Sequence, residues 1–305
     1  MSSKYLISIA GPTAIGKTAA AIEIAQHYHT EILSADSRQF YREMSIGTAK
    51  PSVAELAAAP HHFINSHSIN DPFNVGDFEK QGLDTLSQIF QNYDVAIMAG
   101  GSGLYLKAVT EGFDELPDIN PIVRQELNSL YAEQGLSPLQ EKLKKADPVY
   151  YNTVDLQNPQ RIIRAIEVFE STGQPYSSYR NGNYKQRPFQ TIKIGLDMPR
   201  EQLYERINKR VDIMITDGLV DEVKQLSSYR NLNALNTVGY SEIFDYLDGK
   251  TDLPRAIELI KQNTRRFAKR QLTWFRKDKD IQWFLPTDVP AIIHFIDDTI
   301  ARLSV

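Results

Sequence analysis

The 305-residue sequence contains no cysteine, and this absence excludes several kinds of chemistry. A chain without thiols can form no disulfide, no thiolate zinc site and no cysteine nucleophile. Long apolar runs are missing as well: the longest stretch without a formal charge, residues 56–70, holds three histidines and several polar residues, so no membrane span is predicted. Residues 1–9 lack the long apolar region and the cleavage site of a secretion signal. We therefore expect a soluble, cytoplasmic protein.

The remaining composition is that of an ordinary globular protein. Hydrophobic residues make up 42% and charged residues 24%, which argues against disorder, collagen-like repeats and coiled coils. The length suggests one large α/β domain or two smaller units. The net charge of −4, taken alone, would disfavour a nucleic-acid partner.

Strand-like and helix-like segments alternate in the first third of the chain. Apolar, β-rich runs at residues 4–10, 31–35 and 94–99 predict strands, and periodic apolar patterns at 17–26 and 75–92 predict helices. Strands of this kind end in polar or glycine-rich turns. This pattern predicts a parallel sheet whose functional site lies at the carboxyl ends of the strands.

A change of pattern after Gly112 predicts an inserted all-helical domain. Prolines separate short amphipathic segments there, and the next strand-like run is at residues 191–198. We predict an α/β core formed by residues 1–113 and 189–305, and a helical domain formed by residues 114–188. Beyond Pro199 the chain is expected to be almost wholly helical, with helices near 200–216, 218–229, 239–248, 254–277 and 290–303.

The turn between the first strand and the first helix matches the phosphate-binding motif G-x-x-x-x-G-K-[ST]. In such a loop the backbone N–H groups and the helix N-terminus bind phosphate, the lysine reaches the terminal phosphates, and the hydroxyl can hold Mg²⁺. A plain glycine turn is the weaker interpretation, because the spacing and both flanking elements agree with the motif. The predicted phosphate-binding residues are Gly11, Pro12, Thr13, Ala14, Ile15, Gly16, Lys17 and Thr18, with Thr18 as the metal ligand.

This loop does not by itself identify the reaction. A kinase or ATPase would be expected to end a strand with a metal-binding carboxylate. The strand at 94–99 ends in glycines instead, whereas the strand at 31–35 is followed by Asp36. The hypothesis of a small-molecule kinase is therefore weakened but stays open.

Further motifs follow in order along nearly the whole chain. They are Asp36-Ser-Arg-Gln-Phe-Tyr41, Ile46-Gly-Thr-Ala-Lys-Pro51, Pro60-His-His62, Phe73 to Phe78, Gly100-Gly-Ser-Gly-Leu-Tyr105, Asn158-Pro-Gln-Arg-Ile-Ile-Arg-Ala-Ile-Glu167, Arg206-Ile-Asn-Lys-Arg210, Val238-Gly-Tyr240 and Lys269-Arg-Gln-Leu-Thr-Trp-Phe275. Together with the phosphate-binding loop, these motifs resemble the tRNA dimethylallyltransferase (isopentenylpyrophosphate transferase) family. The resemblance implies a P-loop NTPase-like fold. It also implies transfer of a dimethylallyl group from its diphosphate to N6 of adenosine 37 beside the tRNA anticodon, with Mg²⁺ as cofactor.

The resemblance assigns roles to residues that the chemistry also favours. An exocyclic adenine amine is a poor nucleophile, so a carboxylate that accepts its proton assists the reaction; Asp36 is the candidate base, and an Asx turn or helix cap is its plain structural alternative. By resemblance, Ser102 offers a hydroxyl near the reacting centre, where the family usually has threonine. Arg206 and Arg210 would face the diphosphate, although a solvated helix face explains them almost equally well.

One basic segment changes the interpretation of the net charge. Residues 255–279 hold nine basic and two acidic residues, a distribution expected of a face that follows RNA phosphates. Ile257, Ile260, Phe267 and Trp274 are expected to form the apolar seam of this helix.

The resemblance and the charge pattern together predict a tRNA-binding surface that includes the inserted domain. Tyr41, Tyr105 and Tyr240 could stack on bases, with core packing the more common role of a tyrosine. The predicted tRNA-binding residues are Asp36, Ser37, Arg38, Gln39, Ser102, Arg124, Gln160, Arg161, Arg164, Val238, Gly239, Tyr240, Arg266 and Arg270.

Three alternatives stay open beside this hypothesis: an adenylate isopentenyltransferase acting on AMP, ADP or ATP, the small-molecule kinase, and a non-catalytic RNA-binding module. We expect a monomer that binds tRNA and dimethylallyl diphosphate. Ser241 stands where the family pattern would have a basic residue, which puts one phosphate or base contact in doubt. The adjacent pair His61 and His62 is predicted to be structural, because no further metal ligands accompany it.

Overall fold

The computed structural model describes residues 3–114, 117, 119–180 and 185–304. Within it the chain divides into two compact units, residues 1–110 with 187–305, and residues 111–186. The first unit is an α/β unit, and the second is helical. Each is described here by itself.

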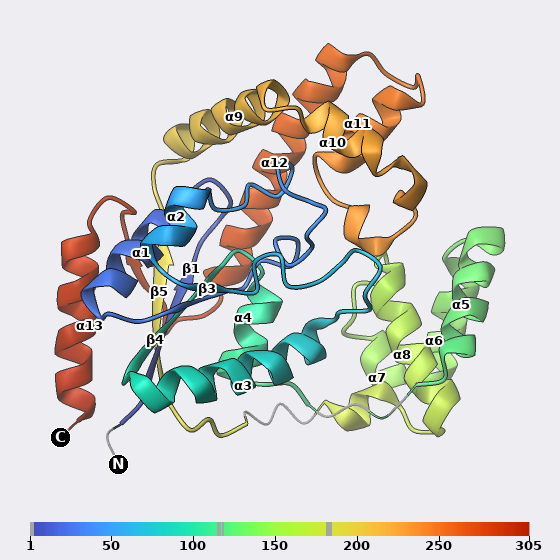
Figure 1. Ribbon diagram of the computed structural model, residues 1–305. Coiled ribbons are helices and arrows are strands. Elements are labelled where there is room, and N and C mark those ends of the chain that lie inside the picture. The colour runs from blue at the N-terminus through green and yellow to red at the C-terminus, as the bar shows by residue number, and fades with distance from the viewer. Residues whose placement is uncertain (1–2, 115–116, 118, 181–184, 305) are drawn as a thin grey trace. The chain divides into compact units, whose positions relative to one another are not determined.

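The α/β unit is built on a six-stranded parallel sheet (Figure 1). Its strands lie in the order β3-β2-β4-β1-β5-β6, and every neighbouring pair is parallel. The strands are β1 (Tyr5–Ala10), β2 (Ile32–Ser34), β3 (His61–His62), β4 (Val95–Gly100), β5 (Gln190–Leu196) and β6 (Gln282–Phe284). The predicted α/β class with a parallel sheet is confirmed.

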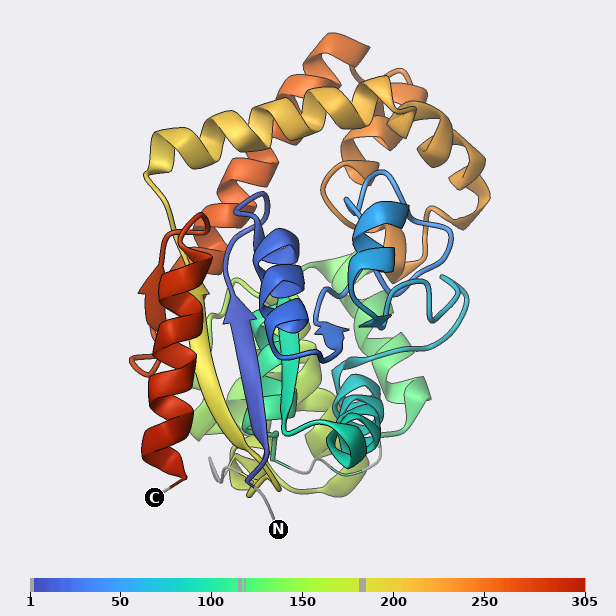
Figure 2. The ribbon, with the colours of Figure 1, turned by 60° about the vertical axis from the view of Figure 1, so that its left-hand side comes forward.

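Helices cover both faces of this sheet, which explains why the central strands β1 and β4 are buried and mostly apolar. Ile7 and Ile9 of β1 pack with α1 (Lys17–His27) and α13 (Val289–Leu303) on one face (Figure 2). Leu6 of β1 packs on the other face with α3 (Val75–Asn92) and α4 (Gly103–Thr110). All six residues of β1 are buried.

The helices near the carboxyl ends of the strands form a third apolar cluster. It combines residues of α9 (Arg200–Thr216), α10 (Leu219–Gln225), α11 (Tyr240–Leu247) and the first half of α12 (Leu253–Phe275). The second half of α12 runs back onto the sheet, where Ala268 and Phe275 join the two sheet clusters. In this way α12 links the outer helices to the edge of the sheet where the predicted site lies.

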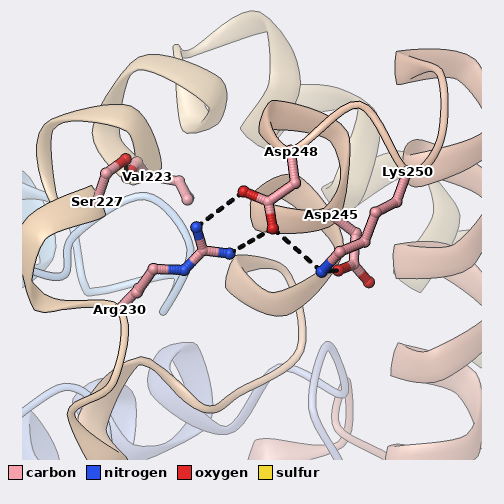
Figure 3. A network of polar contacts seen from close by, with 6 residues as sticks. All are labelled: Val223, Ser227, Arg230, Asp245, Asp248 and Lys250. Carbon is pink, nitrogen blue, oxygen red and sulfur yellow. Dashed lines mark hydrogen bonds and ion pairs between the residues drawn. The ribbon is translucent and has the colours of Figure 1, made fainter.

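An exposed polar network connects the turn that precedes α11 with the turn that follows it. Both terminal nitrogens of Arg230 donate to the Asp248 carboxylate, at 2.8 and 2.7 Å, and Lys250 lies 2.9 Å from Asp245 and 3.1 Å from Asp248 (Figure 3). The guanidinium also lies over the Phe244 ring, 5.0 Å from its centroid. Arg230 and Lys250 lower the pKa of Asp248 by hydrogen bonding to its charged form.

The predicted elements agree with the structure where the pattern is strong and fail where elements are very short. The helix expected at 75–92 is α3, whose start is capped by Asn74 and Asp77 in a reciprocal capping box. The expectation of an almost wholly helical chain beyond Pro199 missed β6, and β3 was also missed. Both are edge strands of three and two residues, although β2, which also has three residues, was predicted from its apolar run. The short helix α2 (Val53–Ala58) was not predicted either.

The helical unit contains α5 (Pro121–Gln134), α6 (Ser137–Ala146), α7 (Pro148–Tyr151) and α8 (Pro159–Thr172). Leu127, Leu139, Leu143 and Ile166 belong to its own apolar core. Three of these helices begin at a proline preceded by a capping side chain, as at Asn158 before α8. Residues 111–186 form the unit for which residues 114–188 were predicted.

Candidate active site

The phosphate loop joins β1 to α1 at the carboxyl edge of the sheet. Gly16 caps the helix with a φ of 109°, a left-handed conformation that favours glycine. A Cβ on Gly16 would also lie 3.4 Å from the Arg206 guanidinium. The Lys17 ammonium donates hydrogen bonds to the carbonyl oxygens of Gly11 and Pro12, at 2.9 and 2.7 Å. The loop therefore folds around its own lysine, and the predicted contact of Lys17 with phosphate stays a prediction.

A cluster of positive charge surrounds this loop. Thr13, Gly16, Lys17 and Thr18 line a cavity of about 760 Å³ together with Arg206 and Arg210 of α9. Burial lowers the pKa of Lys17 to about 8, an effect that Asp36 opposes and Arg210 reinforces. Burial and the neighbouring Arg206 also lower the pKa of Arg210. Closely spaced cations of this kind favour an anionic ligand.

Asp36 follows β2 and lines this cavity. Its Oδ1 accepts a hydrogen bond from the Arg38 N–H at 3.0 Å, so the Asx turn considered as its structural alternative is present. The turn uses one carboxylate oxygen and leaves the other outside it. The two interpretations of Asp36 are therefore compatible, because the turn can orient the carboxylate for chemistry.

Ser102 lies beside Asp36 because β2 and β4 approach each other very closely at their ends. A Cβ on Gly100 would overlap the carbonyl group of Ala35, so only glycine permits this approach. The Ser102 hydroxyl accepts a hydrogen bond from the Ser37 N–H at 3.1 Å and lies 3.3 Å from the Ser37 hydroxyl. The structure thus brings together Asp36 and Ser102, which are far apart in sequence.

A second cavity, of about 340 Å³, adjoins the first and shares Thr13, Asp36 and Arg210 with it. Most of the residues predicted to bind tRNA within the α/β unit line this second cavity. They are Asp36, Ser37, Arg38, Ser102, Val238, Gly239 and Arg270. Asp36 therefore lies where the cavity of the phosphate loop and the second cavity meet.

Three predicted tRNA-binding residues of this unit lie elsewhere. The Tyr240 side chain is fully buried and donates a hydrogen bond to Glu222 at 2.6 Å, so the suggestion that it stacks on a base is wrong. The Gln39 amide lines the first cavity and donates to the carbonyl oxygens of Thr48 and Ala49, both at 3.2 Å. Arg266 is exposed on α12 outside both cavities.

The helical unit uses two of its predicted tRNA-binding arginines internally. The buried Glu167 carboxylate pairs with Arg124 at 2.8 Å and with Arg164 at 2.7 Å. A buried carboxylate requires such partners, so these two cations have a structural role that the sequence did not indicate. Gln160 and Arg161 are exposed at the start of α8.

The buried face of α12 differs from the predicted apolar seam. Ile260 is buried, but Phe267 and Trp274 are 40% and 42% exposed. The buried face instead carries Ala256, Ile260, Ala268, Gln271 and Phe275. Part of the predicted basic face is also neutralised within the protein, because Lys261 pairs with Asp212 and Arg276 with Asp197.

Two residues of α12 that line both cavities were missed as site residues. Phe267 was assigned to the apolar seam, and Gln271 was only part of a family motif. A usable signal was present for Gln271: it is a polar residue three positions after Ala268 and four before Phe275, on the apolar face of the helix.

His61 and His62 form β3 and have structural contacts, as predicted. The His62 ring pairs with Glu31 at 2.6 Å, and His61 hydrogen-bonds the Ala59 carbonyl oxygen at 2.8 Å. Among the described residues, no group of three or more His, Asp or Glu side chains is arranged to hold a metal ion. None of the described helices is both long and apolar enough to cross a membrane.

Comparison with known proteins agrees with the motifs. The family model described as IPP transferase matches residues 39–278. A tRNA dimethylallyltransferase of Christiangramia forsetii is 57% identical over 282 residues, which cover 92% of this chain and 93% of that relative. The chain belongs to the IPP transferase family. A Flavobacterium johnsoniae tRNA dimethylallyltransferase is 53% identical, with 96% of this chain and 97% of that relative covered.

Solved structures of IPP transferases have the same fold. The full-length tRNA isopentenylpyrophosphate transferase of Bacillus halodurans is 37% identical with a TM-score of 0.73, covering 99% of this chain and 98% of its own. A eukaryotic dimethylallyltransferase described as acting on tRNA is 26% identical with a TM-score of 0.77, covering 94% of this chain and 75% of its own. The predicted family and the P-loop NTPase-like core are confirmed.

Proposed function

We propose that this chain transfers the dimethylallyl group of dimethylallyl diphosphate to N6 of adenosine 37 in tRNA and releases diphosphate. One observation carries the proposal: Asp36 lies at the junction of a cationic, phosphate-loop cavity and a second cavity lined by the predicted tRNA-binding residues. The curated relatives named above are tRNA dimethylallyltransferases. The two cavities would bring two substrates to one carboxylate.

The phosphate loop serves here as a cradle for the leaving group. The allylic C–O bond breaks in the reaction, and its electron pair leaves with the diphosphate. Lys17, Arg206, Arg210 and the loop amides are placed around the cavity in which this negative charge would develop. Preorganised positive groups stabilise such charge most when water is excluded.

The acceptor amine would enter through the second cavity. The adenine must leave its stack in the anticodon loop to reach a pocket of this kind. The N6 lone pair attacks the allylic carbon, and as the new N6–C bond forms the N6 proton passes to the Asp36 carboxylate. The Ser102 hydroxyl beside Asp36 would help to orient the amine.

A divalent metal fits the residues present only if the substrate supplies most of its ligands. Thr18 lines the diphosphate cavity, whereas the described residues form no cluster of acidic or histidine ligands. Mg²⁺ commonly binds through one or two protein groups together with substrate phosphates and water. We therefore propose Mg²⁺ as the cofactor, held by Thr18 and the diphosphate, where it would neutralise charge on the leaving group.

The tRNA surface is proposed to include the exposed basic side of α12, with Arg266 and Arg270, and the start of α8, with Gln160 and Arg161. Arg124 and Arg164 remain part of this proposal through their solvent-exposed edges, 47% and 36% exposed. A cytoplasmic location follows from the proposed substrate. Action as a monomer stays a prediction.

The deciding assay incubates the protein with dimethylallyl diphosphate, Mg²⁺ and either unmodified tRNA or AMP, and then analyses the nucleosides by mass. We expect dimethylallyl adenosine from tRNA only. Product on AMP alone would indicate an adenylate isopentenyltransferase, and phosphate transfer from ATP would indicate a kinase. Either result would contradict the proposal.

The role of Asp36 is tested with Asp36→Asn, which keeps the acceptor for the Arg38 N–H and removes the base. We expect kcat to fall about 10²- to 10⁴-fold with unchanged tRNA affinity. Asp84→Asn, an exposed change on α3, is the matched control. Unchanged turnover in Asp36→Asn would exclude this carboxylate as the base.

A further inference from the structure

Gln271 of α12 is a buried polar side chain that connects two turns of the candidate site. Its Oε1 accepts a hydrogen bond from the Thr13 N–H of the phosphate loop at 2.9 Å. Its Nε2 donates to the Gly101 carbonyl oxygen, also at 2.9 Å. The residue is 8% exposed and lines both cavities. One amide therefore bridges the loop that follows β1 and the turn that follows β4.

The chemistry of this bridge requires an amide. It must satisfy a backbone donor at Thr13 and a backbone acceptor at Gly101 at the same time, and a glutamine side chain offers one group of each kind. Glutamate would present only acceptors, and methionine neither a strong donor nor a strong acceptor. A buried N–H or C=O left without its partner is costly.

Gln271 can approach this turn closely because Gly101 has no side chain. A Cβ at Gly101 would overlap the Gln271 Nε2 atom. One helical turn further along α12, the Trp274 ring occupies the place that a Cβ on Gly103 would take. The glycines of this turn thus admit α12 against the sheet edge, which gives their spacing a structural reason apart from phosphate binding.

The two bridged turns carry the two halves of the proposed chemistry. Thr13 lies in the middle of the phosphate loop, and Gly101 directly precedes Ser102, whose hydroxyl holds the Ser37 backbone next to Asp36. A change in the separation of these turns would move the leaving group relative to the base. The same helix exposes Arg266, Lys269 and Arg270 away from its buried face, so the bridge also relates the phosphate loop to the proposed tRNA surface.

We infer that Gln271 is a positioning residue, which sets the phosphate loop in register with the Ser102 turn so that the diphosphate and the acceptor amine are aligned for transfer. This inference rests on the proposed function for its catalytic consequence. Its effect on the loop itself needs no tRNA. Small misplacements of reacting groups can lower a rate about 100-fold.

The test compares Gln271→Met, which keeps the length and bulk of the side chain, with Gln262→Met, an exposed change on the same helix. For Gln271→Met we expect kcat to fall about 10- to 100-fold, the Kd for inorganic pyrophosphate to rise and the Kd for tRNA to stay within about twofold. Gln262→Met should match the wild type in all three. A fall in tRNA affinity that parallels the loss of activity would assign Gln271 to docking and overturn the inference, as would wild-type kcat and pyrophosphate binding.

A second variant tests the same bridge from its other end. Gly101→Ala should displace the Gln271 amide and lower kcat with little change in tRNA affinity. If both variants act through the bridge, the double variant should lose little more activity than the worse single one, because the shared interaction is lost only once. Multiplicative losses would overturn the inference. If Gln271→Met does not fold, Gly101→Ala alone decides: wild-type kcat and pyrophosphate binding would refute it.

The two proposals can fail separately in these measurements. A wild-type protein that does not modify tRNA would refute the proposed function, while the pyrophosphate affinities would still test the effect of Gln271 on the loop. A wild-type protein that modifies tRNA, together with an equally active Gln271→Met variant, would refute the inference alone.

Discussion

The ammonium group of Lys17 should make anion binding at the phosphate loop depend on pH above neutrality. Burial lowers its pKa to about 8, with Asp36 acting in the opposite direction. A bound diphosphate favours the charged form, so binding is tightest when this lysine is protonated. Below pH 8 that form predominates. Above pH 8 it is lost progressively, and the contribution of Lys17 to anion binding is lost with it.

The size of the effect follows from this pKa. With a pKa of about 8, the protonated fraction is about 0.9 at pH 7 and about 0.03 at pH 9.5. Pyrophosphate affinity should therefore fall over this range by the contribution of the Lys17 charge, to a limit of about 30-fold. The assay is calorimetric titration with inorganic pyrophosphate at constant ionic strength from pH 6.5 to 9.5. Above pH 8, binding should also take up protons, which a comparison of buffers of different ionisation enthalpy measures.

Two variants separate Lys17 from other titrating groups. Lys17→Met should bind more weakly and show only the pH dependence of pyrophosphate itself, which is common to all the proteins compared. Lys50 lines the same cavity with a pKa lowered to about 8 by burial, but its ammonium is bonded to the Tyr41 carbonyl oxygen and to Asn65, both at 2.6 Å. Lys50→Met should therefore keep the wild-type slope. The reasoning is refuted if Lys17→Met keeps that slope as well.

Three further predictions concern stability and RNA binding. Because Arg230 lowers the pKa of Asp248, this pair should stabilise the fold above about pH 4 and lose its effect as the pH falls through the lowered pKa. The melting temperature of Asp248→Asn should therefore lie below that of the wild type at pH 7 and converge with it in acid. A difference in melting temperature that is the same at every pH would contradict this. Tyr240→Phe removes the 2.6 Å hydrogen bond to the Glu222 carboxylate and should cost about 1–3 kcal/mol in urea unfolding; an unchanged midpoint would show that the bond adds nothing. Arg270→Glu should weaken tRNA binding and reduce its salt dependence by about one phosphate contact, whereas an identical salt slope would remove Arg270 from the RNA surface.

Local patterns in the sequence were sufficient for much of the fold. The phosphate loop was predictable because a strand, a glycine turn and a helix follow one another without interruption, and the helix at 75–92 because its apolar residues recur on one face. The edge strands β3 and β6 were not predicted: each pairs with a single neighbour in the sheet, and that pairing is set only in the tertiary structure.

The candidate site likewise has residues that local motifs predict and residues that only the tertiary structure identifies. Gly11–Thr18 and Asp36 could be named from the sequence, because each lies within a continuous motif whose chemistry depends on residue type and spacing. The buried state of Tyr240, the pairing of Arg124 with Glu167 and the bridge made by Gln271 could not. They depend on which surfaces of α8, α11 and α12 meet other elements, and burial and hydrogen bonding between distant residues are set only when the helices pack. The sequence by itself determined the family and the kind of chemistry, whereas the tertiary structure decided which polar side chains line the candidate cavities and which hold the protein together.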